Sequence, residues 1–269
     1  MLSRFNVSKH QRPKNFLILL ISICCVGTSA PLRSDSSFDE LIVWNVGQGQ
    51  WVTEVKATVC IHYDAGGERN PRQEILRKCS GKQNYLLLSH WDWDHIGWAP
   101  DLAAQLPKLC LFSLPQGPAN ARKQQALQAI PLCTVAERNQ LLAFVQVIYR
   151  PQGSFGFLSS PNDWSQVVVS KDFQALIPGD SPVRQEKKWL KLSPTDTRGL
   201  ILGHHGSRTS TGKRLLEYLP GLRWAVASAR KQRYGHPHPQ IVALLKKEKV
   251  PLLRTQDWGH LRFQKRISR

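Results

Sequence analysis

Four times along this chain, a short apolar run is followed closely by side chains that can bind a metal ion. These side chains are His90, Asp92, Asp94, His95, Asp180, His204, His205 and His236. Short apolar runs bounded by Gly and polar residues are typical of buried strands. The pattern therefore requires a fold that brings the ends of several strands, far apart in the sequence, to one common edge.

The rest of the pattern predicts a layered α/β domain. Apolar or alternating runs predict strands at 41–46, 51–54, 58–63, 85–88, 108–112, 144–149, 166–170, 173–177, 200–202, 224–227 and 259–264. Helical spacing predicts helices at 71–78, 119–129, 184–191, 213–218 and 240–248. The strands come first as hairpins and then alternate with helices. We therefore expect sheets between helices, in a single domain over residues 36–269.

Residues 1–30 have the layout of a secretory signal peptide. Basic residues without an acidic one precede an apolar run over 16–26, and small residues follow at 27–30. As a helix the run spans roughly 16 Å, about half of a bilayer core. We therefore expect a protein exported to the periplasm or secreted, with no stable membrane span after processing. An N-terminal anchor that is kept is the less favoured alternative.

Four cysteines follow residue 30: Cys60, Cys79, Cys110 and Cys133. None of them has the spacing of a metal site. An even number in an exported protein permits two disulfides, in three pairings among which the sequence does not choose. Pairing between neighbours, Cys60 with Cys79 and Cys110 with Cys133, is the hypothesis to test.

The segment 89–97, with the sequence SHWDWDHIG, is the densest group of potential ligands. In an extended turn, His90 and Asp92 project to the same side. Asp94 and His95 then fall at the turn into the next element, where they can face a second ion. Imidazole and carboxylate suit Zn²⁺, and a carboxylate-rich set also admits Mn²⁺ or Fe²⁺. We expect one or two divalent ions here, above all zinc or manganese.

The order of the motifs HWDWDH, GD, HHGS and YGHP resembles the metallo-β-lactamase superfamily. Within it, the chain is most similar to the C-terminal hydrolase domain of the ComEC family of competence proteins. The segments VGQG at 46–49 and DAG at 64–66 resemble that family's first hairpin. The resemblance covers about residues 41–264 and implies an αββα sandwich with metals at one sheet edge. Asn45 and Gln50 depart from the acidic residues usual at their positions.

The resemblance also implies a role for each residue of the site. One ion would be flanked by His90, Asp92 and His204, and the other by Asp94, His95 and His236, with Asp180 between them. Two such ions can bind a water molecule, lower its pKa and so hold a hydroxide. Asp94 would orient the attacking water, and His205 would act as a supporting donor or proton shuttle. The sequence does not separate the role of His205 from that of His204.

The charge of the chain points to a polyanionic partner. Lys and Arg total 37 against 19 acidic residues, which gives a net charge of +18. Such an excess suits nucleic acid or an anionic membrane. The predicted substrate contacts are Ser207, Arg208, Lys213, Trp91 and Trp93, the tryptophans by stacking on unpaired bases. A solvated basic surface, and tryptophans packed under the metal loop, are the alternative interpretations.

These features predict an exported, metal-dependent hydrolase. The expected activity is that of a phosphodiesterase or nuclease acting on DNA, or on another phosphodiester polyanion, through a metal-bound hydroxide. Two alternatives stay open. One is a metal-dependent esterase or phosphodiesterase for a small-molecule or cell-envelope substrate, which would lack steep salt dependence. The other is a catalytically silent polyanion-binding module. β-Lactamase activity is disfavoured because Asp92 replaces a usual His, and the sequence does not define the oligomeric state.

Overall fold

The computed structural model describes residues 38–152 and 160–266. The expected signal peptide at 1–30 lies outside these residues. Within the described ranges, no helix combines the length and the apolar character that crossing a membrane requires.

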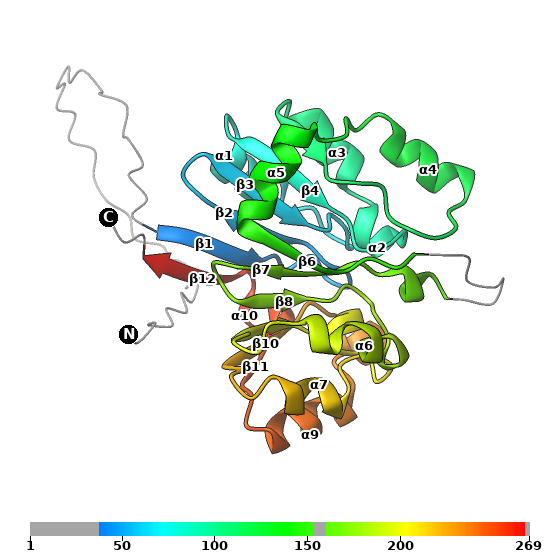
Figure 1. Cartoon of the computed structure of the whole chain (residues 1–269), viewed down its shortest axis with the longest axis vertical. Coiled ribbons are helices and arrows are strands. Elements are labelled where there is room, and N and C mark those ends of the chain that lie inside the picture. The colour runs from blue at the N-terminus through cyan, green and yellow to red at the C-terminus, as the bar shows by residue number, and fades with distance from the viewer. Residues whose placement is uncertain (1–37, 153–159, 267–269) are drawn as a thin grey trace, which may run out of the picture.

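Two six-stranded sheets face each other at the centre of the molecule (Figure 1). The first has the order β12-β1-β2-β3-β4-β5. Its strands are β1 (Phe38–Val43), β2 (Val52–Val55), β3 (Val59–Tyr63), β4 (Gln83–Leu87), β5 (Leu109–Leu111) and β12 (Leu261–Arg266). Strands β12 to β3 pair antiparallel, and β3, β4 and β5 pair parallel. The parallel part places the ends of β3 and β4 at one edge.

The second sheet has the order β11-β10-β9-β8-β7-β6. Its strands are β6 (Val145–Tyr149), β7 (Val167–Ser170), β8 (Ala175–Ile177), β9 (Gly199–Ile201), β10 (Trp224–Ala227) and β11 (Leu252–Arg254). The four strands from β8 to β11 run parallel. Their carboxyl ends therefore share one edge, and three of the ligand-bearing motifs follow β8, β9 and β10.

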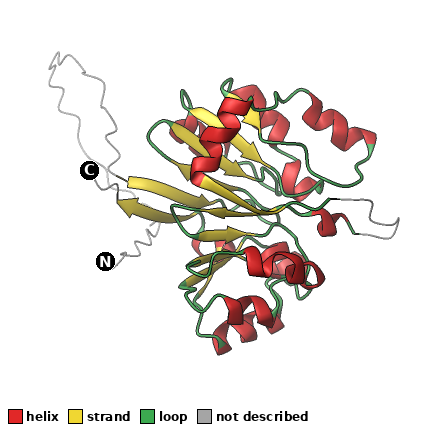
Figure 2. Cartoon of the chain, in the orientation of Figure 1, coloured by secondary structure: helices red, strands yellow, loops and turns green. Residues whose placement is uncertain are grey.

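Helices cover the outer faces of both sheets (Figure 2). On the side of the first sheet they are α1 (Arg72–Cys79), α2 (Trp93–Ile96), α3 (Ala99–Gln105), α4 (Ala121–Gln128) and α5 (Val135–Phe144). The later helices are α6 (Val183–Trp189), α7 (Lys213–Tyr218), α8 (Lys231–Tyr234), α9 (Pro239–Lys247) and α10 (Thr255–Trp258). Short 3-10 turns are η1 (Pro161–Trp164), η2 (Leu190–Leu192) and η3 (Gly203–Gly206). This is the expected αββα sandwich.

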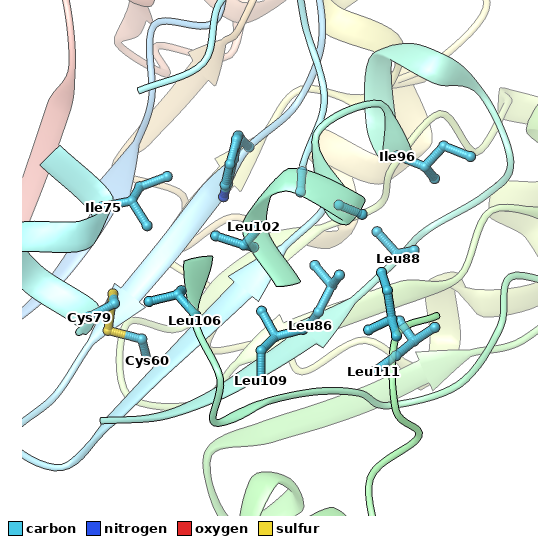
Figure 3. Close-up of a cluster of buried hydrophobic side chains, with 14 of the residues drawn as sticks. Cys60, Ile75, Cys79, Leu86, Leu88, Ile96, Leu102, Leu106, Leu109 and Leu111 are labelled. Carbon is cyan, nitrogen blue, oxygen red and sulfur yellow. A yellow bond between two sulfur atoms is a disulfide. The ribbon is translucent and has the colours of Figure 1, made fainter. Parts of the chain in front are cut away.

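Three apolar clusters hold these layers together. One lies between the first sheet and its helices (Figure 3), one between the sheets, and one under the helices of the second sheet. Along β1, Leu41 and Val43 belong to the cluster between the sheets, whereas Ile42 points to the helices. Successive side chains of a strand point to opposite faces. A continuous apolar run thus fills two layers at once.

Two disulfides tie strands of the first sheet to the segments outside it. Cys60 on β3 pairs with Cys79 at the end of α1 (Figure 3), and Cys110 on β5 pairs with Cys133. The pairing of sequence neighbours is therefore confirmed. Cross-links of this kind are typical of oxidising compartments.

Each predicted strand is present, and the sequence missed β11 together with several helices. The missed helices are α2, α3, α5, α8 and α10. Three of them have only four residues, too few for a helical period to be visible. Helix α5 did carry a signal, because Thr134 and Glu137 form a capping box at its start.

Candidate metal centre

The ligand-bearing segments meet where the parallel strands of both sheets end. The loop 88–92 leaves β4, Asp180 follows β8, and the paired histidines follow β9. Carboxyl ends of adjacent parallel strands lie at the same edge of a sheet. The predicted convergence of distant motifs is therefore present in the structure.

The best-formed group consists of His90, His95 and Asp180. Each offers one ligand atom, and these atoms lie within 4.8 Å of one another. His95 Nε2 lies 3.0 Å from Asp180 Oδ1, and His90 Nε2 lies 3.9 Å from Asp180 Oδ2. All three side chains are buried.

Among residues 38–152 and 160–266, three atoms of this group find no hydrogen-bond partner. They are the Nε2 atoms of His90 and His95 and Oδ1 of Asp180. The short contact between His95 and Asp180 lacks hydrogen-bond geometry. Buried polar atoms without a partner carry a desolvation cost of about 1–3 kcal/mol each. A divalent cation between them would satisfy all three, so the residues present fit a metal ion.

A second group joins Asp94, His95 and His205. His205 Nε2 lies 3.1 Å from Asp94 Oδ2 and 3.9 Å from Asp180 Oδ2. The structure thus places His205 beside Asp94 and His95, where we had expected His236. Asp180 faces both groups, in the bridging place that the resemblance implied.

His204 and His205 have different surroundings. His205 is buried, whereas the His204 side chain is 29% exposed. His204 Nε2 lies 3.6 Å from Asp180 Oδ2, and its Nδ1 contacts Asn162 at 3.2 Å and Thr209 at 3.3 Å. His204 therefore lies at the outer rim, and His205 belongs with the inner ligand candidates.

An unusual backbone produces this difference. Both histidines have left-handed backbone angles, with φ of 49° for His204 and 57° for His205. Such conformations cost about 1–3 kcal/mol each and cluster at functional sites. Gly206 follows with φ of 86°, and a Cβ there would lie 2.7 Å from Cβ of Pro237. The turn directs two adjacent side chains to one site, which regular extended or helical backbone does not do.

The carboxylate of Asp92 already contacts a cationic side chain, which would compete with a metal ion for it. Its Oδ2 lies 3.4 Å from His90 Nε2, and its Oδ1 lies 3.0 Å from Nζ of Lys123 on α4. The proximity of His90, followed by the contact with Lys123, lowers the pKa of Asp92 despite its partial burial. Lys123 was not predicted as a site residue, because nothing in the sequence places α4 beside the metal loop.

Asp64 is the most important residue that the site prediction missed. Its carboxylate contacts His95 Nδ1 at 2.7 Å and accepts hydrogen bonds from Gln50 Nε2 at 2.7 Å, Ser89 N at 2.7 Å and Ser89 Oγ at 2.8 Å. A carboxylate on Nδ1 holds the proton there and leaves Nε2 free for an ion. The signal was present, because Asp64 also follows a buried strand, β3.

The charges in the two groups of candidate ligands favour binding of a cation. Burial alone would lower the pKa of His95, but Asp180 and Asp64 outweigh it and raise the pKa well above its ordinary value. Burial alone would raise the pKa of Asp180, but His95 and His205 lower it well below its usual range. Asp94 is likewise held ionised, because its hydrogen bond with His205 and the charge of His95 lower its pKa against the effect of burial.

His236 is half-buried and belongs to neither group of the described residues. Its ring lies 5.9 Å from that of His204, and its Nδ1 lies 3.2 Å from Gln48 Nε2. Burial, with the positive potential of His205 and His204, lowers its pKa to about 4.

The predicted substrate contacts divide into exposed and buried residues. Trp93 is 38% exposed, and the guanidinium of Arg122 lies 5.2 Å from the centroid of its ring. Trp91 is packed in the apolar cluster under the metal loop, so the structure does not offer it to a ligand.

The three contacts expected after His205 also differ from one another. Arg208 is exposed, and Lys213 is exposed but paired with Glu217 at 2.9 Å. Ser207 is buried, and its Oγ contacts Thr209 Oγ1 at 3.0 Å. Ser207 therefore shapes the loop behind His204, and Arg208 is the residue of the three that is free to meet a substrate.

Comparison with known proteins places the chain beside competence proteins. It is 26% identical over 190 residues to ComE operon protein 3 of Bacillus subtilis, covering 66% of this chain and 24% of that protein. It is 27% identical over 242 residues to Recombination protein 2 of Haemophilus influenzae, covering 83% of this chain and 29% of that protein. These homologues confirm the resemblance to the ComEC family. The chain spans about a quarter of the length of these relatives.

No family model matches the chain. Among solved structures, the short form of human tRNase Z is similar with a TM-score of 0.39 and 14% sequence identity. That similarity covers 82% of this chain and 98% of the other.

Proposed function

We propose that this chain is a metal-dependent hydrolase that cleaves phosphodiester bonds, above all in DNA. The observation that carries the proposal is the buried group of His90, His95 and Asp180, whose three facing atoms have no hydrogen-bond partner in the part of the chain that the structure describes. Removing such atoms from water without compensation is unfavourable unless something binds them. The resemblance to the ComEC hydrolase domain supports the assignment of the reaction.

The side chains at the site are of the types that metal-dependent hydrolysis needs. A divalent ion, when bound, supplies a Lewis acid for phosphate oxygens and lowers the pKa of a water molecule. His90, His95, His205 and Asp180 are the residues that would hold it. Asp94 stays ionised because its pKa is held low, so it orients a water molecule rather than taking its proton. The 38% exposure of its side chain leaves it open to that water.

Binding of a polyanion is supported by the charge around the site. Arg208 is exposed beside the histidine turn, and Arg122 covers the exposed ring of Trp93 beside the metal loop. Lysine and arginine contacts to phosphates release counterions and make binding depend strongly on salt. An exposed aromatic ring is a platform for an unpaired base.

Export is part of the same proposal. Residues 1–30 would direct it, and the two disulfides of the first sheet support an oxidising destination, periplasmic or secreted. The substrate would then be DNA outside the cytoplasm.

The test is a cleavage assay on the purified chain without residues 1–30. Single- and double-stranded DNA would each be incubated with Mn²⁺, Zn²⁺ or Mg²⁺, beside the variants Asp94→Ala and Asp196→Ala. Asp196 is an exposed carboxylate just before β9, at the end of the strand opposite to the site, so it controls for loss of an acidic side chain. We expect metal-dependent cleavage that is lost only in Asp94→Ala.

Other results would redirect the proposal. Bound metal without DNA cleavage would favour a small-molecule or cell-envelope ester as substrate. DNA binding without metal and without cleavage would favour a silent polyanion-binding module. Either outcome would contradict the proposed nuclease activity.

A further inference from the structure

The loop 46–50 brings a buried amide to the edge of the metal centre. Gly47 has φ of 78°, and a Cβ there would lie 2.4 Å from Glu68 Oε2. Gly49 has φ of 135°, and a Cβ there would lie 2.4 Å from the Cα of Gly67. The two glycines therefore let the loop pack closely on its neighbour, and Gln48 between them is buried and reaches His236.

The orientation of the Gln48 amide is fixed by the backbone. Its Oε1 accepts a hydrogen bond from the N–H of Arg230 at 3.2 Å. A backbone N–H can only donate, so the amide oxygen must face it. The amide nitrogen is then the atom that faces His236 Nδ1, at 3.2 Å.

This orientation determines where the proton of His236 lies. The NH₂ group of an amide can only donate, so Nδ1 of His236 must accept and carries no hydrogen. In a neutral imidazole the proton is then on Nε2. Within the described part of the chain, Nε2 of His236 has no hydrogen-bond partner, so its N–H is available to a ligand.

His95 shows the opposite arrangement. Its Nδ1 faces the carboxylate of Asp64 at 2.7 Å, which can only accept while it is ionised. The Nδ1 proton is therefore held by Asp64, and Nε2 is the nitrogen left to face an ion. The hydrogen-bond partner of Nδ1 thus decides whether Nε2 of a histidine can bind a metal ion or donates a hydrogen bond.

Ion pairs hold the loop 46–50 beside the segment that contains Arg230. Glu68 pairs with Arg230 and with Arg233, each at 2.9 Å, and accepts the backbone N–H of Gln48 at 3.3 Å. The Arg230 N–H that orients the amide is thereby fixed against the loop that carries Gln48.

We propose that Gln48 is a positioning residue that fixes His236 with its proton on Nε2, so that His236 donates a hydrogen bond to a phosphate oxygen instead of binding metal. The identity of that oxygen rests on the proposed function. The tautomer and the exclusion of His236 from the ligand set do not. This replaces the ligand role that the sequence predicted for His236.

The tautomer can be measured directly. Long-range ¹H–¹⁵N NMR spectra of the ¹⁵N-histidine-labelled protein distinguish the two neutral forms, and His236→Gln assigns the signal. His238 is an internal reference, because its Nδ1 accepts the backbone N–H of Gln240 at 3.3 Å. We expect both residues to carry the proton on Nε2 in the wild-type protein. A His236 with its proton on Nδ1 would overturn the proposal.

Gln48→Glu tests the cause. Glutamate keeps an oxygen for the Arg230 N–H but presents an acceptor to Nδ1, so the His236 proton should move to Nδ1 while the signal of His238 stays unchanged. An unchanged His236 signal in this variant would show that Gln48 does not set the tautomer.

Metal content tests the second half of the proposal. His236→Gln should keep the metal content of the wild-type protein after loading with Zn²⁺ and gel filtration, whereas His95→Gln should lose metal. Loss of metal in His236→Gln would make His236 a ligand and overturn the proposal. Neither readout requires cleavage, so a protein with the expected tautomer but without nuclease activity contradicts only the proposed function.

Discussion

Replacing Asp64 by Asn should weaken metal binding without unfolding the protein. Asp64 has a left-handed backbone with φ of 57°, a conformation that Asn adopts readily. The substitution keeps the size of the side chain. It replaces Oδ2, which contacts Gln50, Ser89 and His95, by an NH₂ group that can only donate. His95 Nδ1 must then accept, and the proton moves to Nε2, the atom that the ion needs.

The magnitude follows from the role of such partners. Loss of the group behind a metal-binding histidine typically costs 10- to 100-fold in affinity, which is about 1.4–2.7 kcal/mol. The carboxylate meets His95 at 2.7 Å, and the substitution inverts the tautomer rather than merely loosening the ring. We therefore expect an effect near 100-fold for Zn²⁺ and for Mn²⁺.

The assay is a competition titration with a chromogenic chelator. Asp196→Asn, an exposed carboxylate away from the site, is the matched control and should bind metal like the wild-type protein. Circular dichroism would establish that each variant is folded. A folded Asp64→Asn protein with wild-type metal affinity would refute the idea that Asp64 prepares His95 for an ion.

Three further predictions concern stability and substrate binding. Replacing both Cys110 and Cys133 by Ala should lower the free energy of unfolding by about 3 kcal/mol, because the disulfide closes a loop with a separation of 23 residues. Urea titration measures this free energy, and an unchanged midpoint would contradict the prediction. Burial lowers the pKa of His62 to about 4 from 6.5, so the unfolded chain binds the proton more tightly and about 3 kcal/mol of stability should be lost as the pH falls from 6.5 to 4. His62→Gln should flatten that part of the urea-midpoint profile, and a profile like that of the wild type would exclude His62 as its cause. Trp93→Ala should weaken binding of single-stranded DNA, measured by fluorescence anisotropy, by about 1–3 kcal/mol. Trp91→Ala should instead lower the free energy of unfolding by about 3–5 kcal/mol. Equal effects of the two substitutions on DNA binding would contradict the burial of Trp91.

The strands and the edge that carries the site could be predicted from the sequence, because both depend on local patterns. Apolar runs such as 85–88 must be buried on two faces, and a polar motif after such a run lies at a strand end. The same rule applied to the run before Asp64 would have added it to the site. Its neighbour in space, His95, is distant in sequence, and no local pattern joins them.

Other features depend on tertiary geometry that no local pattern contains. The order of His204 and His205 around the site follows from two consecutive left-handed residues, which the spacing of the motif does not reveal. The contact between Lys123 and Asp92 requires the packing of α4 on the metal loop. The role of His236 depends on which atom of the Gln48 amide faces it, and that is decided by a backbone N–H near residue 230.

The most direct test of the account is a crystal structure of the protein soaked with Zn²⁺, with anomalous scattering measured at the zinc edge. We predict a peak at about 2.0–2.2 Å from His95 Nε2 and from an oxygen of Asp180. His236 should lie outside the coordination sphere of every peak. Crystals that take up no zinc at Asp180, or a zinc ion bound to His236 Nε2, would contradict the account.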